Sequence, residues 1–169
     1  ETTSFWFFKC FDFCAKLGAD HVSAYILKIE PGTPFWKTAD TMCLPDEDSA
    51  ADQYLFMVEK LGEHGYAQYE ISNFTKPGKE SRHNLQYWRC GEYLGIGPGA
   101  HSFSRDNRTW CISSAKEYAE GVIRFESEHL TELDHMNEYV MTSLRRVEGI
   151  DLGFVAERFG AKHRERIET

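Results

Sequence analysis

The sequence lacks a long apolar run, an excess of basic residues and an even set of cysteines. Among its 169 residues, the longest stretches without a charge are too rich in Ser, Thr, Gly and Pro to span a bilayer. Lys and Arg number 19 against 27 Asp and Glu, a net charge of −8, which argues against a broad nucleic-acid surface. Five scattered cysteines make a poor disulfide framework. We therefore expect a cytoplasmic protein.

The amino terminus lacks an initiating Met, a basic region and a cleavage site for secretion. It enters apolar residues at once, which indicates a piece cut from a longer protein. Hydrophobic residues make up 41% and aromatic residues 14%, so a folded domain with a real core is expected rather than a disordered chain.

A third cysteine is missing where an iron–sulfur motif would need it. Cys10 and Cys14 have the C-x3-C spacing that opens the C-x3-C-x2-C motif of radical S-adenosylmethionine (SAM) enzymes, but Leu17 stands at the third position. Two thiolates cannot hold a four-iron cluster that leaves one iron open. We therefore interpret Cys10 and Cys14 as buried positions of a helix.

The first part of the chain alternates helices and strands. Gly18 and Gly65 are typical helix ends, and the acidic Asp46 to Asp48 marks a helix start whose carboxylates suit the helix dipole. Such alternation predicts parallel βα units, with chemistry in the loops after the strands, here 30–44 and 72–92. The predicted elements are helix 4–18, strand 21–29, helix 46–64 and strand 66–71.

The later part of the chain changes character after about residue 130. Ser114, Thr131 and Asp151 are predicted N-caps, and Arg105 to Asn107 is the predicted turn of a hairpin. The charged residues from 162 onward are expected to lack packing partners. The predicted elements are strand 93–96, hairpin 101–112, helix 114–125, helix 134–146 and helix 151–159, with a boundary near 127–131.

The stretch from Tyr69 to Trp88 gathers chemically active side chains after a strand. A neutral imidazole can ligate iron, so His83 is a candidate haem ligand, and Arg82 and Lys76 could pair with propionates. The alternative is that His83 caps a short helix and the aromatic residues belong to the core. The candidate haem or porphyrin site consists of Glu70, Asn73, Arg82, His83, Asn84, Tyr87 and Trp88.

A glycine-rich loop is the second candidate site. Glycines after a strand let the backbone approach a ligand, but no Gly-Lys-Ser/Thr follows, so this is not a phosphate loop. The alternative is a tight turn into the hairpin. The loop residues are Gly97, Gly99, Ala100 and His101.

The remaining histidines are weaker candidates for a functional role. His21 and His64 stand near the ends of predicted elements and suit capping or the surface. His129 and His135 have no cysteine nearby, so they make a weak zinc site.

Several separated motifs, in order, resemble the oxygen-independent coproporphyrinogen III oxidase-like family of radical SAM proteins. The resemblance covers nearly the whole chain. Within the family, His83-Asn-Leu-Gln-Tyr-Trp88 is similar to a motif of the haem chaperone (HemW-like) branch. The other matching stretches are His21–Tyr25, Glu30–Phe35, Leu44–Asp46, His64–Tyr66, Glu70–Phe74, Lys76–Gly78, Glu80–Trp88, Tyr93–Ser102, Val147–Leu152 and Glu157–Gly160.

The resemblance implies an α/β fold: the last βα units of an incomplete, TIM-type radical SAM barrel in residues 1–128, and the start of a helical accessory domain in 129–169. It implies that His83 ligates haem iron, that Tyr87 and Trp88 line the macrocycle, and that Gly97, Gly99, Ala100 and His101 face the SAM or porphyrin pocket. The 4Fe–4S cluster and SAM would belong to the full-length protein only.

The expected function is therefore that of a haem-binding piece of a radical SAM haem chaperone, inactive by itself. A true coproporphyrinogen III oxidase, which decarboxylates propionates oxidatively, is one alternative, and a non-catalytic α/β binding module is another. An open barrel piece exposes strand edges, which favours a homodimer.

Overall fold

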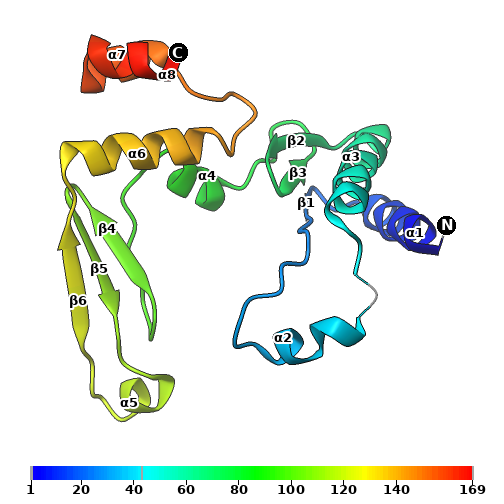
Figure 1. Ribbon diagram of the computed structural model, residues 1–169, viewed down its shortest axis with the longest axis horizontal. Helices are drawn as coiled ribbons and strands as arrows, with labels where there is room; N and C mark the ends of the chain where they lie inside the picture. Colours follow the sequence, from blue (N-terminus) through cyan, green and yellow to red (C-terminus); the bar gives the residue numbers. More distant parts are fainter. Residues whose placement is uncertain (1, 43, 169) are drawn as a thin grey trace. The chain divides into compact units, whose positions relative to one another are not determined.

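The fold was obtained as a computed structural model that describes residues 2–42 and 44–168. The chain forms two compact units, residues 1–80 and 81–169, which we describe separately. Figure 1 shows a helical unit with a small sheet and a second unit with a longer hairpin sheet. The division predicted near residue 128 concerns domains of a larger protein and stays a prediction.

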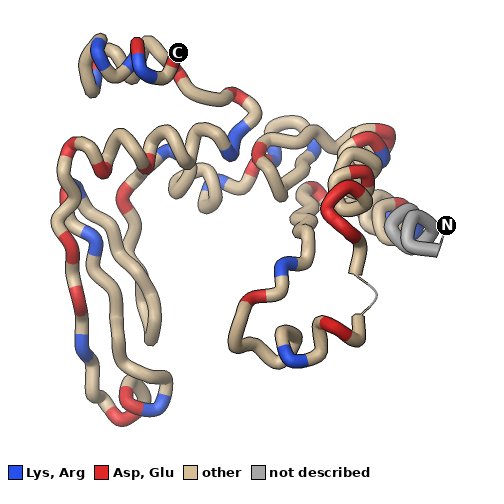
Figure 2. The backbone as a smooth tube through the Cα atoms, viewed as in Figure 1, with Lys and Arg blue, Asp and Glu red and all other residues tan. Residues whose placement is uncertain are grey.

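The first unit follows the predicted order of elements. The acidic helix start predicted at Asp46 to Asp48 is confirmed in α3 and is visible in Figure 2. Asp46 is its N-cap, since the side chain accepts a hydrogen bond of 2.8 Å from the Ser49 N–H. The elements are α1 (Thr2–Lys16), β1 (His21–Ser23), α2 (Pro34–Thr38), a 3-10 turn η1 (Ala39–Thr41), α3 (Glu47–Glu63), β2 (Ala67–Glu70) and β3 (Asn73–Thr75).

The sheet of the first unit is antiparallel, so the prediction of parallel pairing was wrong. Its order is β1-β3-β2, and β3 pairs antiparallel with both neighbours. The strands β1 and β2 do run in the same direction, as a βα unit requires, but the turn after Glu70 returns the chain between them. A tight local reversal thus inserts a strand where direct pairing was expected.

The first strand is shorter than predicted. Residues 21–29 read as one strand, but only His21 to Ser23 pair, because β3 offers just three partners, Asn73 to Thr75. Beyond the register, Tyr25, Ile26 and Leu27 are all more than half exposed. The apolar, β-branched composition therefore predicted a longer strand than the three residues that pair in the described sheet.

The core of the first unit lies between α1, α3 and the sheet. It comprises Phe11, Met57, Leu61, Tyr66 and Phe74, of which Leu61 and Phe74 are fully buried. The predicted burial of Cys10 and Cys14 was wrong: Cys10 is exposed and Cys14 half-buried. Phe11 takes the inward position instead, because a shift of one residue turns a helical side chain by about 100°.

The second unit contains an antiparallel sheet of order β4-β5-β6, with the predicted hairpin confirmed in β4 and β5. Arg105 adopts a positive φ of 55° at the turn. Figure 1 shows α6 running across one end of this sheet. The elements are α4 (Arg82–Trp88), β4 (His101–Ser104), β5 (Asn107–Cys111), α5 (Ala115–Ala119), β6 (Phe125–His129), α6 (Glu132–Ser143), α7 (Leu152–Phe159) and α8 (Ala161–Glu168).

Predicted N-caps are confirmed in this unit, while three lengths or contacts differ. Ser114 and Thr131 form capping boxes and Asp151 caps α7. The helix after Ser114 ends at Ala119 rather than near 125, because Gly121 takes a positive φ of 81° and the chain turns into β6. Cap chemistry is local, which explains why it was predictable.

The other two differences concern the ends of this unit. The strand predicted at 93–96 is reduced to one bridge between Tyr93 and Phe103. The charged end was expected to lack packing partners, but residues 161–168 form α8, which packs on α7. His163 and Ile167 also line a small pocket with residues of α6.

Within residues 2–42 and 44–168, no helix is long and apolar enough to cross a membrane. The outer strands are β1 and β2 in the sheet of the first unit and β4 and β6 in that of the second, where Phe103 of β4 is also bridged to Tyr93. A homodimer through such edges stays a prediction.

Candidate functional site

Helix α4 presents His83 and Tyr87 on one face. Ser81 caps the helix by accepting a hydrogen bond from the Asn84 N–H at 3.3 Å, which fixes the first turn. His83 is exposed, and its ring meets that of Tyr87, one turn later, at a centroid distance of 4.9 Å and an interplanar angle of 87°. Residues four apart share a helix face, so the geometry follows from the sequence spacing.

A run of aromatic rings continues from Tyr87 to the hairpin of the same unit. The Tyr87 and Tyr93 ring centroids lie 4.6 Å apart, and Tyr93 lies 6.0 Å from the buried Phe103. These edge-to-face and tilted arrangements are the stable ones for aromatic pairs. The exposed imidazole of His83 is thus connected to the interior of the unit by ring contacts.

Trp88 lies against α6 and the residues that follow it. The guanidinium carbon of Arg145 lies 4.4 Å from the centre of the indole ring, and the indole Nε1 is buried with no hydrogen-bond partner in the described chain. Arg82 is exposed and Asn84 half-buried. On α4, Arg82 and His83 are therefore the exposed residues of the predicted site, whereas Tyr87 is half-buried and Trp88 is engaged internally.

The other predicted haem-site residues lie in the first unit. Glu70 is fully buried, and its Oε1 accepts a hydrogen bond of 2.7 Å from the Ser72 N–H and one from the Asn73 amide. Lys76 donates to the His64 carbonyl and lies 4.1 Å from the centre of the Tyr66 ring. These contacts hold the turn between β2 and β3 in place.

The glycine-rich loop is an irregular segment that precedes the first strand of the hairpin. Gly97 and Gly99 have φ values of 114° and 72°, which L side chains rarely adopt. The Gly99 N–H donates to the Cys111 carbonyl at 2.9 Å. His101 is exposed, and its ring stacks on Trp110 at 5.6 Å. The role of this loop in ligand binding stays a prediction.

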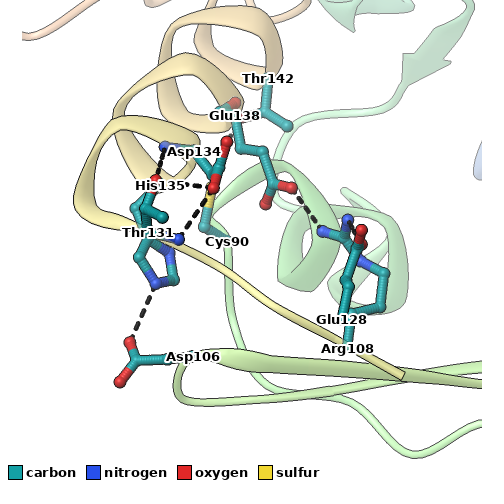
Figure 3. A network of polar contacts seen from close by, with 9 residues as sticks. All are labelled: Cys90, Asp106, Arg108, Glu128, Thr131, Asp134, His135, Glu138 and Thr142. Carbon is teal, nitrogen blue, oxygen red and sulfur yellow. Dashed lines mark hydrogen bonds and ion pairs between the residues drawn. The ribbon is translucent and has the colours of Figure 1, made fainter.

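Sequence reasoning missed an ion network around α6, drawn in Figure 3. Arg108 donates to Glu128 at 2.8 Å and to Glu138 at 2.6 Å. Burial lowers the pKa of Arg108, but hydrogen bonding to Glu138 and the charge of that carboxylate raise it above the usual arginine range. The residues beside Arg108 on β5, Asn107 and Thr109, are polar, so the sequence carried no signal for a partly buried ion network there.

Figure 3 also shows how the neighbouring polar groups are paired. His135 Nε2 lies 2.9 Å from an oxygen of Asp106, and Cys90 Sγ lies 3.4 Å from Thr142 Oγ1. His129 lies 3.4 Å from the Asn107 side chain. His129 and His135 thus have separate partners.

The donor sets of the described residues do not suit an iron–sulfur cluster. Residues 2–42 and 44–168 contain no group of three His, Cys, Asp or Glu side chains arranged to hold a metal ion. On α1, Cys10 is exposed and Cys14 half-buried, with Leu17 at the third position of the motif.

Comparisons with known proteins first define a class. No family model matches the sequence. In structure, the chain resembles coproporphyrinogen III oxidase (HemN) from Escherichia coli, a radical SAM enzyme, with a TM-score of 0.67 over 93% of this chain and 40% of that one, at 17% identity. The fold is therefore that of part of the radical SAM protein HemN.

Sequence relatives then specify the branch. The chain is 36% identical to the haem chaperone HemW of Bacillus subtilis over 86% of its length, and 37% identical to HemW of Mycobacterium tuberculosis over 94%. The chain spans about 40% of the length of these relatives. It belongs to the coproporphyrinogen III oxidase-like radical SAM family, on the side of the haem chaperones.

Proposed function

We propose that this chain forms the haem-binding part of a radical SAM haem chaperone. The observation that carries the proposal is the exposed His83 of α4 in edge-to-face contact with the half-buried Tyr87, in a chain whose relatives are named haem chaperones. An exposed imidazole can reach the iron of a haem, and the adjacent phenol ring gives flat surface for the macrocycle.

In this proposal each residue of α4 has a distinct task. His83 ligates the iron through a neutral ring nitrogen, and Tyr87 holds the imidazole orientation through the edge-to-face ring contact. Arg82, exposed at the same end of α4, pairs with a propionate. Trp88 supports the helix from behind, through its contact with Arg145.

The wider setting is also part of the proposal. The cluster and SAM, which the family implies for the full-length protein, would be supplied by residues outside the described ones. The protein would act in the cytoplasm. The cargo would be haem rather than coproporphyrinogen, because the relatives that cover most of this chain are named for haem.

Titration with ferric haem tests the proposal. The wild-type chain should give a saturable Soret band, and His83→Ala should weaken binding by at least about tenfold, since even outer-shell partners of a metal ligand are worth 10–100-fold. His129→Ala is the matched control, because His129 is also exposed in the second unit and its ring lies beside the Asn107 side chain rather than on α4. An unchanged Soret band in His83→Ala would contradict the proposed ligation of the iron by His83.

A further inference from the structure

The second unit contains a pocket that does not include His83. It has a volume of about 560 Å³ and lies among the segment after α4, the hairpin, α6 and α7. Pockets of about 300–1,000 Å³ are typical of small-molecule and cofactor sites. Its apolar wall consists of four aromatic residues, Phe103, Tyr139, Phe154 and Phe159.

The aromatic wall is built by contacts within the unit. The Tyr139 ring lies 4.7 Å from Phe154 and 6.2 Å from Phe159, and the Tyr139 hydroxyl accepts a hydrogen bond from the Asp151 N–H at 3.2 Å. These contacts hold α7 against α6. A flat, conjugated ligand would find ring faces and edges on this side.

The acidic residues of the pocket already have partners. Glu92 accepts hydrogen bonds from the Ser104 hydroxyl at 3.1 Å and from the Arg105 N–H at 2.7 Å. Asp106 pairs with His135, and Asp151 caps α7 through the Phe154 N–H at 2.9 Å. Their charges are thus directed at groups of the protein itself.

The basic residues of the pocket are less well satisfied. Arg146 Nε is buried and makes no hydrogen bond in the described chain, and its ion-pair partner Glu148 lies 3.7 Å away. Arg158 lies 3.7 Å from Glu132. The other two arginines of the pocket are Arg89 and Arg105. Within residues 2–42 and 44–168, no carboxylate forms an ion pair with either of their guanidinium groups.

A buried donor without an acceptor is costly unless a ligand satisfies it. Arginine presents a planar fork that matches a carboxylate in bidentate fashion, and it stacks well on aromatic rings. An aromatic wall next to under-satisfied arginines therefore suits a planar ring system that carries carboxylates.

We propose that this pocket binds the carboxylate-bearing edge of a porphyrin, with Arg146 as the main carboxylate partner. The choice of a porphyrin as the ligand rests on the proposed function, whereas the anionic and planar character of the ligand rests on the pocket alone. The site extends recognition to the macrocycle and its side chains, independently of any iron ligand.

Fluorescence titration of the full chain with metal-free protoporphyrin IX tests this site. Arg146→Gln should weaken binding about tenfold or more, the value of one charge-assisted hydrogen bond. Arg164→Gln is the matched control, because Arg164 lies on α8 outside the pocket and pairs with Glu168 at 2.9 Å. Circular dichroism of both variants checks that they fold.

The dimethyl ester of the same porphyrin separates carboxylate recognition from loss of packing. It should bind more weakly than the free acid, and Arg146→Gln should leave its affinity unchanged; Arg146→Lys, which keeps the charge, should restore part of the affinity for the acid. Equal weakening of acid and ester by Arg146→Gln, or no weakening of either, would overturn the proposal. Because this ligand contains no iron, its result is separate from that of the haem titration on His83.

Discussion

The two units of the chain use their buried residues differently. The first unit packs a continuous apolar core of Phe11, Met57, Leu61, Tyr66 and Phe74, and its predicted site residue Glu70 is sealed inside a turn. The second unit places its ion network, the pocket beside Arg146 and the exposed His83 around a thinner set of buried apolar side chains. Stability and binding are thus concentrated in different parts of the chain.

Substitutions that change ligand binding should therefore be separable from substitutions that change stability. Core residues contribute through buried area, and their loss acts on unfolding. Residues such as His83 and Arg146 contribute through donor and acceptor chemistry toward a ligand. Three stability predictions, in decreasing order of effect, test whether the two units differ in this way.

The largest effect is expected from a cavity in the first unit. Leu61 is fully buried in the core, so Leu61→Ala should lower the free energy of unfolding by about 2–5 kcal/mol in a urea titration followed by circular dichroism. Leu55→Ala, on the same helix with a side chain 64% exposed, should change it by less than about 0.5 kcal/mol. Haem affinity measured under folding conditions should be equal in both variants. A loss of haem affinity in Leu61→Ala alone would contradict the separation of stability and binding between the two units.

A smaller effect is expected from the ion network of the second unit. Arg108→Leu leaves Glu128 and Glu138 without their shared partner, which should cost about 1–3 kcal/mol because these groups are only partly exposed. Lys116→Leu is the control, since its partner Glu120 lies 4.0 Å away in an exposed pair. Equal unfolding midpoints in urea for the two variants would show that the network stabilises the unit no more than an exposed ion pair does.

The smallest effect is a shift in acid stability. Hydrogen bonds from the Thr131 hydroxyl and N–H lower the pKa of Asp134 below its ordinary value of 3.8. A carboxyl with a lowered pKa in the folded state stabilises the fold above its ordinary pKa, and this contribution is lost as the pH falls through the folded value. Circular dichroism between about pH 2 and 5 should therefore show a smaller acid dependence for Asp134→Asn than for wild type. An identical pH profile would contradict the cap assignment.

How much of the fold was predictable depended on the range of the interactions. The caps at Ser114, Thr131 and Asp151 were predicted because each depends on a side chain and a backbone group three residues away. The insertion of β3 between β1 and β2 was not predicted, because strand order depends on pairings across the chain.

The candidate site divides in the same manner. The shared face of His83 and Tyr87 followed from their spacing, and the structure has them in contact. The pocket around Arg146 could not be found in the sequence, because its arginines and aromatic residues come from four separate segments. The tertiary packing of the hairpin, α6, α7 and the segment after α4 brings them together.

Rescue of a cavity variant by free imidazole tests the central claim, ligation of haem iron by His83, most directly. In His83→Gly the ferric haem spectrum should lose its histidine-ligated form, and added imidazole should restore the wild-type Soret band and electron paramagnetic resonance signal. His129→Gly should keep the wild-type spectra with or without imidazole. Unaltered spectra in His83→Gly before imidazole is added would contradict the account, because another group would then hold the iron.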